Sequence, residues 1–235
     1  MDQEDSFFAN SNIDDAELDG VKRIKMPKKN KHRMHAHINP FNTLNIPVPK
    51  DPSFVDWSIH YPTVFGITKN NNNKMVVNTG KYPITYDNQP KEITSEKTPT
   101  VIDIGCGYGG LMFGLSQELP DHLILGQEIR DKVANFVAEK INTLRNNTNC
   151  QRCTNIAVVR TNSMKTFHNY FAKESIEKMF FCFADPHFKR ANHRRRIINT
   201  ALLTDYAYCL KPGGKIYTVT DVKQLHDWEV AKLDQ

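Results

Sequence analysis

The sequence predicts an α/β protein built on a doubly wound, Rossmann-like parallel sheet. Three observations indicate this fold class. Short apolar runs, typical of buried strands, alternate with segments of helical apolar spacing from about residue 98 onward. A glycine-dense turn follows the first run, and the next run ends in an acidic residue. Strands that alternate with helices favour parallel pairing, with helices on both faces of the sheet.

The first predicted strand covers residues 100–104, and the turn after it is rich in glycine. Glycine has no side chain to block a ligand, so the backbone can approach one closely. Gly105, Gly107 and Gly110 also fit the G-x-G-x-x-G pattern of NAD-binding proteins. Asp103 instead favours a zwitterionic or cationic ligand such as S-adenosylmethionine, because a pyrophosphate needs an approach without negative charge. A tight strand–helix turn without a ligand is the structural alternative.

The second predicted strand, about residues 122–127, leads into Glu128, whose carboxylate can accept both hydroxyls of a ribose. The other elements are expected as helices at 110–119, 131–145, 164–172 and 192–209, strands at 156–159, 178–183 and 215–219, and a turn at 211–214. Ligands of such sheets bind at the carboxyl ends of the strands. This rule predicts one site edge that collects Gly105, Glu128, Asn162, Asp185 and Asp221.

The chain divides by composition into three parts. Residues 1–32 form an acidic and then basic tail that is too charged to fold alone, so we expect disorder there. Residues 33–98 form an N-terminal extension, with a polar, asparagine-rich insertion at 66–98. Residues 99–235 form the main domain. The basic block is a nuclear localisation signal, an RNA-gripping arm or a solvated tail.

Composition narrows the function classes. With 235 residues and 39% hydrophobic residues, the chain fits one domain of ordinary size with extensions. No apolar run is long enough to span a membrane, and the acidic N-terminus does not resemble a secretion signal. Five scattered cysteines fit a reducing compartment, and the C-x-x-C of Cys150 and Cys153 is interpreted as a loop feature, so no metal site is predicted. The net charge of +5 is clustered, which indicates a polyanionic partner.

A second motif follows the strand at 178–183. Asp185, stiffened by Pro186, is expected to point into the same crevice as the glycine turn, and an ordinary Asp-Pro turn is the alternative. A basic stretch comes next, formed by Lys189, Arg190, Arg194, Arg195 and Arg196. Some of these side chains are expected to face solvent, and others to contact phosphates. The amide of Asn162, after the strand at 156–159, can bind the edge of an adenine.

Together these segments resemble the eukaryotic-type tRNA (guanine-N7-)-methyltransferase family, the catalytic subunits of a class I, S-adenosylmethionine-dependent enzyme. The resemblance is carried by His35 to Pro40, DIGCGYGG at 103–110, GQEIR at 126–130, TNSMK at 161–165, DPHFKR at 185–190 and TDVKQLHDW at 220–228. It implies methylation of guanine N7 in the variable loop of tRNA. It also implies a WD-repeat partner subunit, and we expect a nuclear location.

The resemblance further implies roles for particular residues. Asp185 would be the catalytic acidic residue, and Lys189 and Asp221 would face the substrate. The S-adenosylmethionine site would be lined by Gly105, Glu128, Ile129, Arg130, Asn162, Ser163 and Cys182.

The sequence also departs from the family pattern. Ala184 replaces the usual proline before the aspartate, His35 replaces an arginine, and Ser163 stands where alanine is usual. The family continues past the 220–228 motif into two further strands, so the C-terminal edge strands are expected to be missing from this chain.

Three rival functions remain at this point. One is methyl transfer to an amine, whose Asp/Asn-Pro-Pro-aromatic motif is matched here except at His187. Another is a truncated remnant that binds RNA or a partner without catalysis. The last is an NAD-dependent dehydrogenase.

Overall fold

The computed structural model describes residues 25–35, 38–42, 44–67, 75–86, 89–90, 97–146 and 153–234. The acidic part of the predicted tail, the asparagine run at 70–73 and Cys150 lie outside these described residues.

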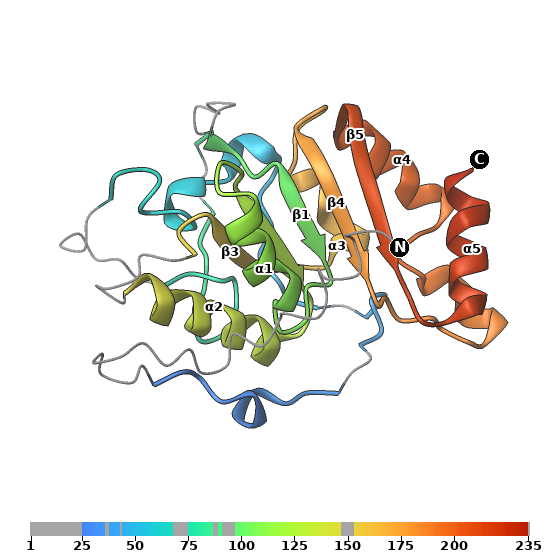
Figure 1. The fold of residues 1–235 in the computed structure, drawn as a ribbon, viewed down its shortest axis with the longest axis horizontal. Coiled ribbons are helices and arrows are strands. Elements are labelled where there is room, and N and C mark those ends of the chain that lie inside the picture. Colours follow the sequence, from blue (N-terminus) through green and yellow to red (C-terminus); the bar gives the residue numbers. More distant parts are fainter. Residues whose placement is uncertain are drawn as a thin grey trace.

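Five parallel strands form one sheet in the order β3-β2-β1-β4-β5 (Figure 1). The strands are β1 Val101–Ile104, β2 Ile124–Glu128, β3 Ile156–Arg160, β4 Ile176–Cys182 and β5 Leu210–Val219. The central strand β1 is buried along its whole length, as a parallel strand covered on both faces must be, which explains its apolar run. The predicted doubly wound parallel sheet is therefore confirmed.

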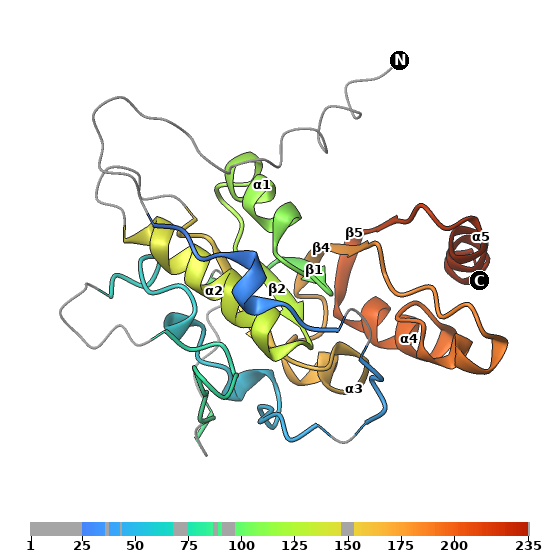
Figure 2. The same ribbon diagram turned by 90° about the horizontal axis from the view of Figure 1, so that it is seen from below.

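Helices cover both faces of this sheet (Figure 2). They are α1 Gly110–Glu118, α2 Asp131–Arg145, α3 Ser163–Thr166, α4 Thr200–Cys209 and α5 Lys223–Leu233, with short 3₁₀ helices η2 Lys29–His32, η3 Pro52–Phe54, η4 Trp57–Ile59, η6 Phe167–Asn169 and η7 Arg190–Arg195. Helices α1 and α2 pack on one face through side chains such as Met112 and Phe136. Helix α4 and η6 cover the other face through Tyr206 and Phe167.

Three predicted elements differ from the observed ones. The helix expected at 192–209 is wrong in its first half, because Asn199 caps a new helix by accepting hydrogen bonds from the N–H groups of Ala201 and Leu202. The helix expected at 164–172 is shorter, since it ends as α3 followed by η6. The turn at 211–214 is a bulge within β5, where the pairing register shifts between Ile176 and Lys178 of β4.

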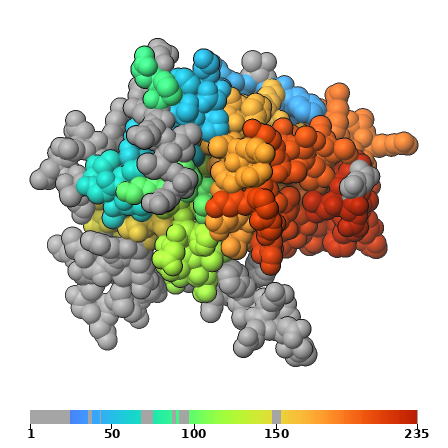
Figure 3. Space-filling model, turned by 90° about the horizontal axis from the view of Figure 1, so that it is seen from above, coloured from blue at the N-terminus to red at the C-terminus, as the bar shows by residue number. Residues whose placement is uncertain are grey.

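The described part of the N-terminal extension packs against the sheet as irregular chain and 3₁₀ turns. Tyr61 is fully buried, and its hydroxyl donates to the carbonyl of Ile124 in β2 at 2.9 Å. Val77 and Ile84, from the predicted insertion, are also buried. The space-filling view shows the extension, coloured blue to cyan, lying directly against the α/β domain (Figure 3). None of the described helices is long and apolar enough to cross a membrane.

Arg145, at the end of α2, connects this extension to the domain. Its guanidinium donates to the backbone carbonyls of His60 and Cys153, both at 3.0 Å, and to that of Ile156. Replacing Arg145 by methionine keeps the bulk but leaves these carbonyls unpaired, so we expect the free energy of unfolding to fall by about 2–4 kcal/mol. Denaturant unfolding would measure the change. Asn142→Ala, at an exposed position of the same helix, should change stability far less, and equal losses would contradict this role.

Candidate active site

One cavity of about 210 Å³ lies at the carboxyl edge of the sheet. It gathers all seven residues that the sequence assigns to the cofactor and the predicted catalytic aspartate: Gly105, Glu128, Ile129, Arg130, Asn162, Ser163, Cys182 and Asp185. These residues follow four different strands, and the parallel sheet brings them together because all its strands end at the same edge. Lys189 and Asp221 are exposed and do not belong to the described lining of this cavity.

The glycine turn after β1 has a left-handed backbone, which glycine adopts without steric cost. Gly105, Gly107 and Gly109 all have positive φ, at 75°, 54° and 78°. The N–H groups of Gly105 and Cys106 donate to the carbonyl of Gln127, at 2.8 and 3.1 Å, which holds the turn against the end of β2. Gly109 was not singled out from the sequence, but a β-carbon there would lie 3.1 Å from side-chain atoms of α1 and α2.

Glu128 is the most firmly held acidic group of the cavity. Its side chain is 3% exposed, and one carboxylate oxygen accepts from the N–H of Gly107 at 3.0 Å. Both oxygens also accept from the guanidinium of Arg130, at 2.9 and 3.0 Å, so the two side chains form a bidentate pair. The backbone N–H of Arg130 donates to the same carboxylate at 2.9 Å, so Glu128 accepts four hydrogen bonds from the protein. A ribose that binds at the end of β2 must therefore replace the guanidinium of Arg130 at this carboxylate.

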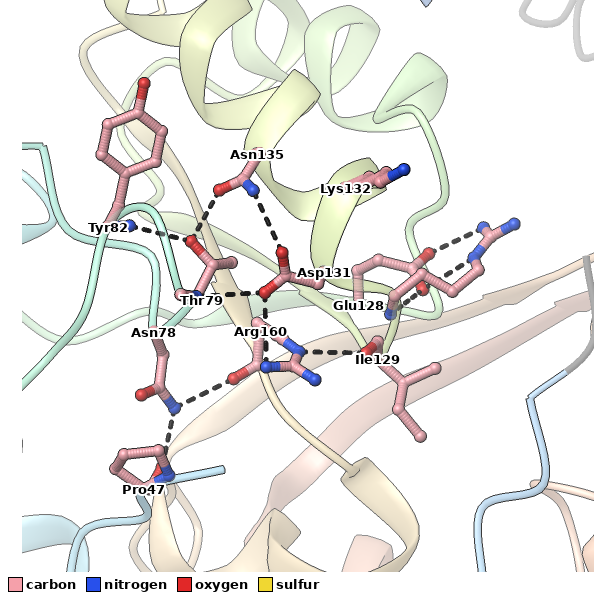
Figure 4. A network of polar contacts seen from close by, with 12 residues as sticks. Pro47, Asn78, Thr79, Tyr82, Glu128, Ile129, Asp131, Lys132, Asn135 and Arg160 are labelled. Atoms are coloured by element: carbon pink, nitrogen blue, oxygen red, sulfur yellow. Dashed lines mark hydrogen bonds and ion pairs between the residues drawn. The ribbon is translucent and has the colours of Figure 1, made fainter. Parts of the chain in front are cut away.

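The loop after Glu128 is held by a second polar network (Figure 4). Arg160, at the end of β3, donates to the carbonyl of Ile129 at 3.3 Å and forms an ion pair with Asp131 at 3.3 Å. Asn135 of α2 accepts a hydrogen bond from the hydroxyl of Thr79 at 2.6 Å. The N-terminal extension therefore helps to fix the loop that carries the predicted cofactor residues.

Asn162 and Ser163 line the cavity from the end of β3, the strand next to β2. The amide of Asn162 donates to the carbonyl of Pro40 at 2.6 Å, which brings the N-terminal extension to the cavity rim. The hydroxyl of Ser163 donates to the side-chain oxygen of Gln127 at 2.7 Å. Sequence reasoning missed Gln127 and Pro40, because the first is hidden inside a strand and the second is distant in the chain.

Asp185 sits in a strained loop after β4. One carboxylate oxygen accepts from the N–H of His187 at 3.1 Å, and the other lies 3.6 Å from the His187 ring nitrogen Nδ1. The side chain of Asp185 is 29% exposed, so it can meet a ligand that enters from solvent. His187 itself has a positive φ of 44°.

Arg196 holds the loop that carries Asp185 against helix α5. Its side chain is almost completely buried, donates to the carbonyl of Pro186 at 2.8 Å, and lies 4.8 Å from the centre of the Trp228 ring in α5. Members of the basic stretch are expected either to face solvent or to contact phosphates, and Arg196 does neither because it is buried. Lys189, Arg190 and Arg194 are exposed beside the cavity.

Comparison with known proteins gives the family. A family model described as "Putative methyltransferase" matches residues 97–235. A tRNA (guanine-N(7)-)-methyltransferase of Eremothecium gossypii is 45% identical over 223 residues, covering 94% of this chain and 71% of the relative. A maize protein of the same name is 45% identical over 211 residues, covering 90% and 76%, and one from Arabidopsis thaliana is 42% identical over 214 residues, covering 91% and 76%. The chain belongs to the tRNA (guanine-N(7)-)-methyltransferase family.

The resemblance inferred from the motifs is thereby confirmed, and the chain is a methyltransferase. The amine-acceptor, remnant and dehydrogenase hypotheses are not favoured, because the match extends over nearly the whole chain to relatives of one name. S-adenosylmethionine fits the cavity chemically, because a fixed carboxylate faces it from one strand end and left-handed glycines leave the backbone accessible. Among the residues that the structure describes, no cluster of three metal-ligating side chains occurs.

Asp103 is an unusual acid of this methyltransferase, because it lies in the central strand with only 2% exposure. Burial, with the nearby charge of Glu128, raises the pKa of Asp103 to about 7. An unfolded aspartate has a pKa of about 3.9. The stability that protonated Asp103 contributes is therefore fully present below about pH 4 and is lost as the pH rises through about 7.

The raised pKa of Asp103 predicts that the stability of the protein depends on pH, and Asp103→Asn should remove this dependence. Asp103→Asn stays neutral at every pH, so its stability relative to the wild type should rise between pH 5 and 8, by up to about 1.4 kcal/mol per pH unit. Thermal unfolding of both proteins without cofactor, at several pH values, measures the difference. Parallel curves would show that Asp103 does not carry the perturbed pKa.

Proposed function

We propose that this methyltransferase transfers a methyl group from S-adenosylmethionine to N7 of a guanine in the variable loop of tRNA. The single observation that carries the proposal is the cavity, which joins the glycine turn and Glu128 to Asp185 at one sheet edge. The curated relatives are named for methylation of this guanine atom in tRNA. The exposed Lys189, Arg190 and Arg194 supply positive charge for a nucleic-acid backbone beside the cavity.

The chemistry requires positioning more than proton transfer. S-adenosylmethionine supplies an electrophilic methyl group on a positively charged sulfur. Guanine N7 carries an unprotonated lone pair at neutral pH, so no general base is needed to activate it. As the bond from N7 to the methyl carbon forms, the carbon–sulfur bond breaks and its electron pair stays on sulfur. The protein must hold N7 in line with that bond.

Asp185 has a defined role in this scheme. Methylation leaves a positive charge on the guanine ring, and a carboxylate beside the ring stabilises that charge as it develops. The same carboxylate can accept hydrogen bonds from the guanine N1 and N2 edge. Glu128 holds the ribose of the donor, the amide of Asn162 binds its adenine, and Lys189 and Asp221 face the tRNA.

A direct assay tests the proposal. Labelled S-adenosylmethionine is incubated with the protein and bulk tRNA, and the modified RNA is digested to nucleosides. We expect 7-methylguanosine as the labelled product. Label in an N-methylated amine, or in protein, would overturn the proposal. Because the resemblance also supports a WD-repeat partner subunit, the assay is run with and without a candidate subunit, and an increase in turnover supports the heterodimer.

The basic block at 21–33 supports a nuclear location. A fluorescent fusion of the whole chain should concentrate in the nucleus. Retention of that distribution after replacement of its seven basic residues by glutamine would show that another signal directs it.

A further inference from the structure

Phe183 has the most unexpected backbone near the active site. Non-glycine residues rarely adopt positive φ, and a bulky one is a marked outlier. Phe183 has a φ of 54°, and together with His187 it brackets Asp185 with left-handed positions. Its N–H donates to the carbonyl of Val219 in β5 at 2.7 Å, so the neighbouring strand fixes this conformation. Glycine would fit the backbone better than phenylalanine.

The side chain of Phe183 gains little from the fold. It is 61% exposed, although large aromatic rings normally stabilise proteins by being buried. It nevertheless lines the cavity together with Asp185 and His187. A strained backbone that presents an exposed ring at the mouth of a binding cavity indicates that the ring contacts a ligand.

The sheet order indicates which ligand this is. Glu128 and Asn162 follow β2 and β3, on one side of the central strand β1, whereas Phe183 follows β4 on the other side. On the proposed assignment, the ribose and adenine of the methyl donor therefore lie away from Phe183, although Cys182, the residue before it, is also assigned to the donor site. Phe183 lines the cavity beside Asp185, which meets a substrate from solvent. The ligand at that position, if the proposed function holds, is a flat purine base.

We propose that Phe183 stacks on the target guanine and positions its N7 for methyl transfer. A base of a folded tRNA must leave its own stack to enter an enclosed site, and an aromatic ring replaces part of the stacking that it loses. Stacking of one base on one aromatic side chain contributes roughly 1–3 kcal/mol. Phe183 is then a substrate-binding residue for the tRNA and not for the methyl donor. This inference rests on the proposed function.

The test compares four variants in steady-state assays with tRNA. Phe183→Leu keeps an apolar side chain without an aromatic face, and we expect it to lower kcat/KM for tRNA by about 10- to 100-fold. Phe183→Gly also relieves the left-handed backbone, so we expect the same loss of activity with an unchanged or higher melting temperature. Phe183→Tyr keeps the ring and should retain most activity. Tyr208→Ala is the matched control, because this ring is 55% exposed at the end of α4, away from the cavity.

Calorimetric titration with S-adenosylmethionine shows whether the Phe183 ring contacts the guanine base or the methyl donor. We expect every Phe183 variant to bind the donor with wild-type affinity. Equal weakening of donor binding and tRNA turnover would overturn the proposal, because the ring would then contact the donor. Normal turnover of Phe183→Leu would overturn it as well. A wild-type protein that binds the donor but methylates no tRNA would instead contradict the proposed function.

A further arm uses Phe188, which is 66% exposed but outside the described lining of the cavity. Phe188→Leu should reduce kcat less than Phe183→Leu does. The reverse order would assign the stacking surface to Phe188 and overturn the assignment to Phe183.

Discussion

Replacing Asp185 by alanine is expected to lower kcat for tRNA methylation by at least about 100- to 1000-fold, the range lost when one preorganised electrostatic group is removed from an active site. The reason is that the guanine ring gains positive charge as its N7 is methylated. Asp185 lines the cavity on the side where we propose that the guanine binds, so its carboxylate can stabilise this charge. The affinity for S-adenosylmethionine should stay within a few-fold of wild type, because the residues proposed to bind the donor, Glu128 and Asn162, lie at the ends of other strands.

Single-turnover methylation and donor titration measure these two effects. Asp185→Asn keeps the size and the acceptor for the His187 N–H, so it separates loss of charge from collapse of the loop. Asp121→Ala removes an exposed acid in the turn before β2, at the opposite edge of the sheet, and serves as the control. Near-normal turnover of Asp185→Ala would refute the catalytic role.

Glu128→Ala is expected to weaken binding of S-adenosylmethionine by at least about 100-fold. Hydrogen bonds to a charged group contribute about 1.5–3 kcal/mol each, and a ribose offers two hydroxyls to this carboxylate. The substitution also removes the acceptor for the Gly107 N–H and for the Arg130 guanidinium, so the turn and the loop lose a shared anchor.

Calorimetric titration measures the affinity, and circular dichroism with thermal unfolding checks that the variant is folded. Glu128→Asp keeps the charge but shortens the side chain, and should give an intermediate affinity. Glu177→Ala is the matched control, because this acid pairs with Lys211 at 2.7 Å at the start of β4, at the other edge of the sheet. Wild-type affinity in Glu128→Ala would exclude this carboxylate as the ribose acceptor.

Much of the site could be predicted because it depends on local order along the chain. Glu128 is the last residue of β2, and Gly105, Asn162 and Asp185 follow their strands within a few residues. Parallel strands end at one edge whatever the details of packing. Asp221 follows β5 at the same edge but is not among the described residues that line the cavity.

Other features could not be predicted because they depend on contacts between distant segments. Arg196 belongs to a run of basic residues that reads as a solvated surface, yet Pro186 and Trp228 bury it. The long helix expected at 192–209 is interrupted at this point. The apolar spacing of residues 192–209 does not show that Arg196 and Ile198 are buried in the interior.

The sequence by itself determined the fold class and the residues at the strand ends, because apolar periodicity and the strand–helix alternation are properties of neighbouring residues. The family followed from the resemblance of its motifs, which are also short local segments of the chain. Only the tertiary structure decided that Pro40 reaches Asn162, that Arg196 supports the loop that carries Asp185, and that β5 holds Phe183 in a left-handed conformation. The first and last of these contacts join residues far apart in the chain, and the second joins the two ends of one loop. Their energies arise from burial and hydrogen bonding that exist only after the sheet has brought the segments together.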